Sequence, residues 1–197
     1  MGLFGRRPRL PAQHRPALAP GERVLAWATV PADGGTAAAD GGTAAADGGT
    51  AAADGGVVVV TNHGLWVPDR TDRWGWHELH KAVWSGRELT VTPATRVADR
   101  DGYAVVADAP VRTYLLLSPG NVPEQVRARL TRSVGYTVHH RLAVGGVRVV
   151  ARRVTGVDGL TWTVRYDTGA AADDPATVAA TDDLVAAARA ATRPADL

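Results

Sequence analysis

Short apolar runs that alternate with polar residues recur along most of this chain. The clearest run is LTWTVRY, in which one face of an extended strand is shared by Leu160, Trp162, Val164 and Tyr166. Similar runs with short connections occupy residues 23–30, 57–61, 64–68, 73–79, 80–92, 103–107, 111–117, 137–144 and 147–154. Many short strands with tight connections indicate a mainly β protein, built as a barrel or a sandwich.

Two segments instead show the spacing of amphipathic helices. Within residues 121–134, apolar side chains four apart form one stripe, at Val122, Val126, Leu130 and Val134. A second helix is expected from about Asp174 to Ala191, with Pro175 in its first turn. The pattern therefore predicts a β unit closed by one amphipathic helix, followed by a small three-stranded antiparallel meander with a C-terminal helix.

A seven-residue unit, DGGTAAA, occurs three times from Asp33 onward and begins a fourth time before Gly56. Without the three units, the flanking apolar runs are joined by Pro-Ala-Asp-Gly-Gly, an ordinary hairpin connection. Paired glycines disfavour a continuous helix, and alanines are too small to build a core. The unit also lacks the interleaved glycine of calcium-binding β-roll repeats. We expect residues 33–56 to form an expanded flexible loop within a hairpin.

Four phrases of the sequence carry a family resemblance: ERVLAWATV, VVVVTNHGLWV, WGWHELHKAVWSGRELTVT and TYLLLSPGNVPEQVRARL. Together they resemble the pleckstrin-homology-like domains of bacteria over about residues 20–134, which implies a β-barrel or sandwich closed by one helix. The chain also resembles uncharacterised actinobacterial proteins in which such a domain precedes a short strand-and-helix tail. The resulting division is a basic flexible leader (1–20), a pleckstrin-homology-like domain (21–134) and a β-meander plus helix (135–197).

The resemblance implies a known ligand class, which the charges of this sequence oppose. Members of that family bind phosphoinositide headgroups through basic residues of the first two strands and their connecting loop. In this chain no Lys or Arg occurs between Arg23 and Arg70, and the loop instead carries Asp33, Asp40, Asp47 and Asp54. Carboxylates repel phosphate. We therefore expect no phosphoinositide binding and favour a protein partner.

The net charge of +2 arises in the first twenty residues, which contain four arginines and no acidic residue. Beyond them, acidic side chains slightly outnumber basic ones. Such a leader touches phosphates only weakly, so a nucleic-acid-associated protein is the alternative class and not the favoured one. No apolar run approaches the ~18 residues of a membrane-spanning helix, and no secretory signal follows the arginines. We expect a cytoplasmic protein without a membrane span.

No residue pattern indicates catalysis, a cofactor or a metal. Cysteine is absent, which excludes a thiol nucleophile and a thiolate metal site. His77 and His80 are three apart and point to opposite faces of a strand, and the neighbours His139 and His140 alternate in the same way. No serine lies in a Gly-x-Ser-x-Gly elbow. We predict a non-catalytic protein with no cofactor and no metal, with an enzyme of unrecognised type as the second alternative.

Six tryptophans against one phenylalanine are an unusual ratio. We expect most of them to fill two cores, and Trp162 to pack with its strand against the C-terminal helix. Trp74 is instead expected at the surface, where it forms a candidate partner contact with Arg70 and Arg73. The predicted function is therefore an interaction module, for protein binding or scaffolding.

Overall fold

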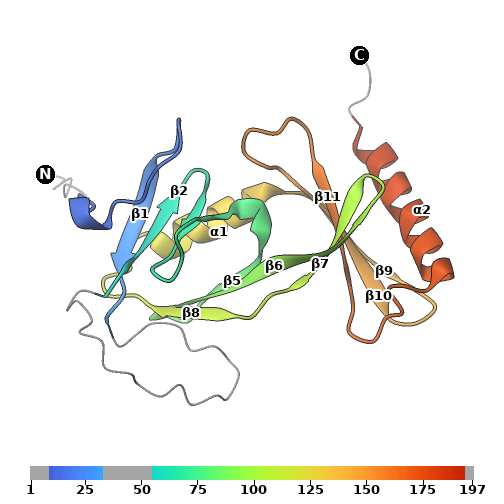
Figure 1. Cartoon of the computed structure of the whole chain (residues 1–197), viewed down its shortest axis with the longest axis horizontal. Helices are drawn as coiled ribbons and strands as arrows, with labels where there is room; N and C mark the ends of the chain where they lie inside the picture. Colours follow the sequence, from blue (N-terminus) through green and yellow to red (C-terminus); the bar gives the residue numbers. More distant parts are fainter. Residues whose placement is uncertain (1–8, 33–54, 194–197) are drawn as a thin grey trace, which may run out of the picture.

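The computed structural model describes residues 9–32 and 55–193, which form two packed units side by side (Figure 1). The leader residues 1–8 and most of the predicted repeat loop, residues 33–54, lie outside the described residues. The first unit contains β1 (Val24–Thr29), β2 (Val57–Thr61), β3 (Gly64–Trp66), β4 (Trp74–Gly75), β5 (Leu79–Trp84), β8 (Arg112–Leu115) and α1 (Val122–Ser133). The second contains β7 (Tyr103–Asp108), β9 (Val134–Arg141), β10 (Gly146–Arg152), β11 (Thr161–Tyr166) and α2 (Pro175–Thr192). The expected mainly β protein with two α-helices is confirmed.

The first unit consists of two groups of antiparallel strands with α1 packed against them. One group has the order β1-β2-β3-β4, and the other joins β5 and β8 to the first half of β6 (Glu88–Arg100). Strands β1 and β2 stay paired as far as Thr29 and Val57, and the N–H of Val30 donates to the carbonyl of Gly56 at 2.8 Å. The runs on either side of the repeat therefore pair directly, as the sequence predicts.

The long hairpin of β6 and β7 connects the two units. The second half of β6 pairs with β7, and β7 pairs in parallel with β11, which gives the order β6-β7-β11-β10-β9. The expected three-stranded meander is therefore only part of a larger sheet, and residues 94–108 of the expected first domain complete it. Sequence pattern misses this pairing because a parallel neighbour is distant along the chain.

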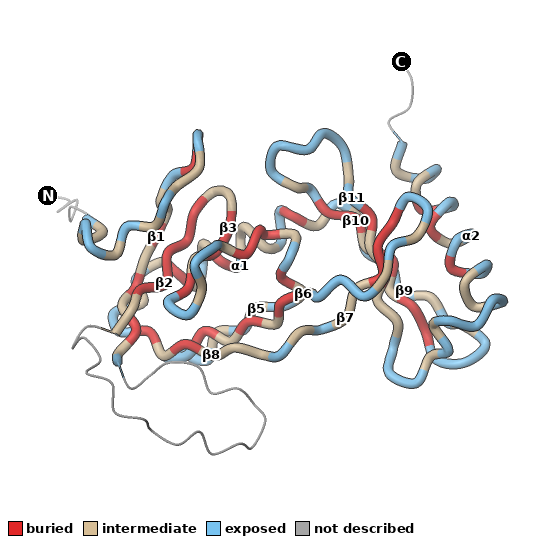
Figure 2. The backbone as a smooth tube through the Cα atoms, in the orientation of Figure 1, coloured by how far each residue is buried: buried red, intermediate tan, exposed pale blue. Residues whose placement is uncertain are grey.

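The second unit has its own core on the face of the sheet that α2 covers. Trp162 is 6% exposed and packs with Val164 of β11 and with Val185 and Ala188 of α2. The ring of Tyr136 lies 5.5 Å from that of Trp162. Figure 2 shows this buried interior separated from that of the first unit. The expected packing of Trp162 against the C-terminal helix is confirmed.

The segment expected as one strand over residues 73–79 is interrupted. After the two residues of β4, a 3-10 turn covers Trp76–Glu78, and only then does β5 begin. The carboxylate of Glu78 accepts a hydrogen bond of 2.6 Å from the N–H of Gly75, which holds the turn. The indole of Trp76 donates to the carbonyl of Thr61 at 3.2 Å. Side-chain bonding at Glu78 therefore overrides the strand alternation.

The described part of the leader, residues 9–20, lies along the first unit. It contains a 3-10 turn at Ala12–His14, and the N–H of Ala19 donates to the buried carboxylate of Glu22 at 3.0 Å. This part of the leader is therefore attached to the fold. Among the described residues, no helix has the length and apolar character needed to cross a membrane.

Candidate functional site

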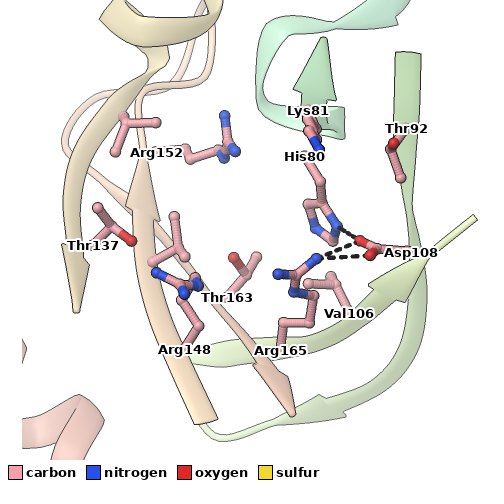
Figure 3. A pocket seen from close by; sticks show the side chains of 12 residues that line it. His80, Lys81, Thr92, Val106, Asp108, Thr137, Arg148, Arg152, Thr163 and Arg165 are labelled. Carbon is pink, nitrogen blue, oxygen red and sulfur yellow. Dashed lines mark hydrogen bonds and ion pairs between the residues drawn. The ribbon is translucent and has the colours of Figure 1, made fainter. Parts of the chain in front are cut away.

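A basic pocket lies between β5 of the first unit and the open face of the second sheet (Figure 3). Its volume is about 330 Å³, and its charged and titratable lining residues are His80, Lys81, Asp108, Arg148, Arg152 and Arg165. The remaining lining residues are Thr92, Val106, Val134, Thr137, Val150 and Thr163. We call this hollow the basic pocket.

Strand alternation places the arginines in this pocket. In β10, Val147, Val149 and Ala151 are fully buried in the second core, so Arg148 and Arg152 project from the other face. Arg148 is opposite Arg165 of β11 in the antiparallel register, which puts both side chains on that same face. The face away from α2 therefore gathers cations from neighbouring strands.

Arg152 is the most unusual residue of the basic pocket. It is only 7% exposed, and its Nη1 donates to Oγ of Ser133 at 2.8 Å and to the carbonyl of Trp76 at 3.4 Å. In the part of the chain that the structure describes, no carboxylate lies within ion-pair distance of it. Burial lowers the pKa of its guanidinium. A buried charge without a counter-charge is costly, and a bound anion would supply one.

Asp108 organises the other wall of the pocket. Arg165 Nη1 donates to both carboxylate oxygens of Asp108, at 2.6 and 2.8 Å, and His80 Nδ1 lies 2.5 Å from Oδ1. Burial raises the pKa of Asp108, but the hydrogen bonds from His80 and Arg165 outweigh this effect and lower the pKa overall. The carboxylate therefore stays ionised and fixes both neighbours.

The basic pocket has a large excess of positive charge. Among the described residues that line it, Asp108 is the only carboxylate, and it pairs with Arg165. Lys81, Arg148 and Arg152 have no ion-pair partner among the residues that the structure describes. Guanidinium and ammonium groups that converge with threonine hydroxyls form a typical set of donors for carboxylate or phosphate oxygens. The arrangement therefore suits an anionic ligand.

A larger hollow of about 570 Å³ is lined in part by residues of the same sheet, but its charges are already balanced. Arg96 is paired with Asp99, and Arg100 Nη2 lies 3.9 Å from Asp173 and donates to the carbonyl of Ala172 at 3.2 Å. Volume would favour this larger hollow, but the unpaired positive charge favours the basic pocket as the site of an anionic ligand.

The predicted partner contact of Trp74, Arg70 and Arg73 takes a different form in the structure. Trp74 was expected at the surface, but it is 7% exposed and belongs to the first core. The guanidinium of Arg70 lies 4.8 Å above its ring and also binds Asp72 at 2.8 Å. Arg73 Nη1 lies 3.4 Å from the buried Glu22. Arg70 and Arg73 therefore already have acidic partners, and none of the three predicted contact residues lines the basic pocket.

Sequence reasoning rejected His80 as a metal ligand in favour of a hydrogen-bonded or rim histidine, and it overlooked the arginines. No group of three or more metal-ligating side chains occurs in the described ranges. His139 instead pairs with Asp167 at 2.8 Å. The arginines could have been found from the alternation of polar and apolar residues in VRVVARR and TVRY. It places Arg148 and Arg152 on one face of their strand, and Arg165 on the same face of its strand as Thr163.

No family model, no curated protein and no solved structure matches this chain. A function for the basic pocket is therefore inferred from the residues that line it and not from a relative.

Proposed function

We propose that this protein is a non-catalytic binding module that takes a small organic anion into the basic pocket. The observation that carries the proposal is Arg152, a buried cation that lines the pocket and has no carboxylate partner in the described chain. Lys81 and Arg148 add further unpaired charge, while Val106 and Val150 provide apolar contact. A volume of about 330 Å³ is in the usual range for small-molecule sites.

We also propose that the first unit is a pleckstrin-homology-like domain. Its two groups of antiparallel strands, followed by the single helix α1, support the resemblance carried by the sequence. No residue of β1 or β2 lines the basic pocket, whereas that family binds phosphoinositide headgroups through its first two strands and their connecting loop. A small organic anion in the pocket is consistent with the expectation of no phosphoinositide ligand.

Titration with citrate tests the anion proposal. We expect isothermal calorimetry to show binding by the intact protein, and Arg148→Gln to weaken it at least roughly tenfold, because a charge-assisted donor is lost. Arg148 is preferable to Arg152 for this test because it is less buried. The matched control is Arg141→Gln, an exposed arginine of β9 outside the pocket lining, and it should bind as the wild type does.

Four outcomes would change this proposal. Equal citrate affinity in both variants, or no binding by the wild type, would overturn the basic pocket as an anion site. Chemical conversion of a bound anion would favour the alternative of an enzyme. Retention of DNA that survives removal of residues 1–18 and ~0.2 M salt would favour the nucleic-acid alternative, since the truncation removes the leader arginines but keeps Ala19.

The exposed edge of β9 favours protein binding as a second candidate function. In the described structure β9 pairs only with β10, and its Val138 is 37% exposed. An unpaired strand edge can accept a strand from a partner. Val138→Lys should therefore abolish capture of a specific partner from native lysate while leaving the melting temperature unchanged. Capture that is unaffected by this substitution would remove the edge from consideration.

A further inference from the structure

A second, smaller hollow lies at the C-terminal end of α1, and we call it the α1 pocket. Its volume is about 130 Å³, and its lining includes Asn62, His77, Arg129, Arg132, Arg153 and Thr155. The α1 pocket contains no acidic side chain among these residues. It is therefore a compact site dominated by three guanidinium groups.

The three arginines line one small hollow without a compensating carboxylate among the described lining residues. None of them has an ion-pair partner within the described ranges. Burial lowers the pKa of Arg129, and the positive charges of Arg132 and Arg23 lower it further. Like charges that are held together in this way favour a bound counter-anion.

A structural role accounts for Arg153 but not for Arg129. Arg153 Nη1 donates to the carbonyls of Arg132 at 3.3 Å and Val134 at 3.4 Å, so it caps the end of α1. The Nε of Arg129, in contrast, is buried and has no hydrogen-bond partner among the residues that the structure describes. The amide of Asn62, which also lines the α1 pocket, is bonded elsewhere: Oδ1 accepts from the N–H of Arg23 and Nδ2 donates to the carbonyl of Gly21. A buried donor without an acceptor is costly.

We infer that the α1 pocket binds the phosphate group of a phosphorylated ligand. The pocket is large enough for one such group and leaves the remainder of the ligand in solvent. The guanidinium groups that line the hollow come from two parts of the chain, Arg129 and Arg132 from α1 and Arg153 from the residue directly after β10. A tetrahedral phosphate accepts hydrogen bonds in several directions and carries more charge than a planar carboxylate, so it fits this set of donors better.

The α1 pocket and the basic pocket are separate sites. Ser133 lines the α1 pocket, and its Oγ accepts the hydrogen bond from Arg152, which lines the basic pocket. Arg148 lines only the basic pocket. Arg148→Gln therefore provides a background in which the α1 pocket can be tested independently of the proposed function.

The experiment is an NMR titration of the Arg148→Gln protein with inorganic phosphate, phenyl phosphate and acetate. We expect both phosphates to shift the Arg129 Nε–H resonance and the amide of Thr155, with acetate having a much smaller effect. Arg129→Gln in the same background should reduce phosphate affinity roughly tenfold, as judged from Thr155. Arg127→Gln, an exposed residue of α1 outside the lining, is the matched control and should leave the titration unchanged.

Several results would overturn the inference. These are no response of Arg129 and Thr155 to phosphate, equal responses to acetate and phosphate, or equal loss in the Arg129→Gln and Arg127→Gln proteins. If Arg129→Gln fails to fold, the exposed Arg132→Gln replaces it with the same expected loss. A response to inorganic phosphate without one to phenyl phosphate would exclude a phosphorylated ligand.

Discussion

Arg152 Nη1 donates a 2.8 Å hydrogen bond to Oγ of Ser133, and this bond joins the last residue of β10 to the last residue of α1. The second unit is thereby tied to the first through a buried polar contact. Oγ of Ser133 also lies 2.7 Å from the carbonyl of Leu130. The guanidinium of Arg152 therefore lines the basic pocket and also contacts α1 of the first unit.

This hydrogen bond predicts that substitutions of Arg152 and of Ser133 change the free energy of unfolding by different amounts. Arg152→Met should lower the free energy of unfolding by no more than ~1 kcal/mol, or raise it, because it removes a buried charge that has no counter-charge among the described residues. Ser133→Ala should cost about 1–3 kcal/mol, because the guanidinium loses its best acceptor. Urea unfolding of both variants measures the difference. A loss above ~3 kcal/mol in Arg152→Met would show that the guanidinium holds the fold together and is not reserved for a ligand.

Trp162 predicts the stability of the second core. Trp162→Ala should cost roughly 3–5 kcal/mol, because the indole is 6% exposed and packs against Val185 and Ala188. Denaturant unfolding checks this value, and Thr161→Ala, at an exposed position of the same strand, is the control. If the tryptophan variant lost less than ~1 kcal/mol, the packing of α2 on the sheet would be disproved.

His80 predicts how anion binding depends on pH. Burial lowers its pKa, the hydrogen bond and charge of Asp108 oppose this, and the charges of Arg165 and Arg152 lower it further, so the net shift is downward. The imidazole is therefore neutral at pH 7 and gains a proton below its ordinary value of about 6.5. Each proton adds positive charge to the basic pocket. Affinity for sulfate, whose charge is constant in this range, should rise as pH falls from 7 toward 5, and His80→Gln should remove this rise.

The lowered pKa of His80 also predicts that the fold becomes less stable as pH falls, whereas anion binding becomes tighter. Because the folded-state pKa of His80 is below the unfolded value, the unfolded chain binds more protons in the window below about pH 6.5. His80 therefore destabilises the fold as pH falls through that window, and sulfate should counteract the loss. Thermal melts of the wild type and His80→Gln with and without sulfate measure both effects. Tighter sulfate binding at higher pH would contradict the prediction.

We predict that the protein tolerates deletion of the DGGTAAA repeat. Removal of the twenty-one residues Asp33 to Ala53 joins Ala32 to Asp54 and leaves a short turn. The pairing of Thr29 with Val57 lies outside the deleted segment, so the hairpin keeps its register. Loop-closure entropy changes by only ~0.6 kcal/mol per doubling of length, and the shortened protein should be equally stable or up to ~2 kcal/mol more so. Destabilisation beyond ~2 kcal/mol in urea would assign the repeat a structural role.

A calcium titration provides an independent check of the repeat. Its aspartates are seven apart with no interleaved ligand, so millimolar calcium should leave the amide signals of its Ala, Gly and Thr residues unchanged. Calcium-induced dispersion of these signals would instead identify a binding element.

The sequence by itself determined the two helices, most of the strands and the buried face of β11. These features depend on local periodicity, because alternation with a period of two or 3.6 residues assigns each side chain to a face. Trp162 was placed correctly for this reason. Trp74 was not, because it lies in β4, a strand of only two residues, and its burial in the first core depends on packing that alternation along so short a strand does not specify.

Only the tertiary structure decided the parallel pairing of β7 with β11 and the convergence of Lys81, Arg148, Arg152 and Arg165. Alternation places Arg148 and Arg152 on one face of β10, but it does not say what that face meets. The opposing wall comes from β5, a strand of the other unit that is more than sixty residues earlier in the chain. Contacts of that separation depend on the packing of whole elements, and a period read along one strand carries no information about them.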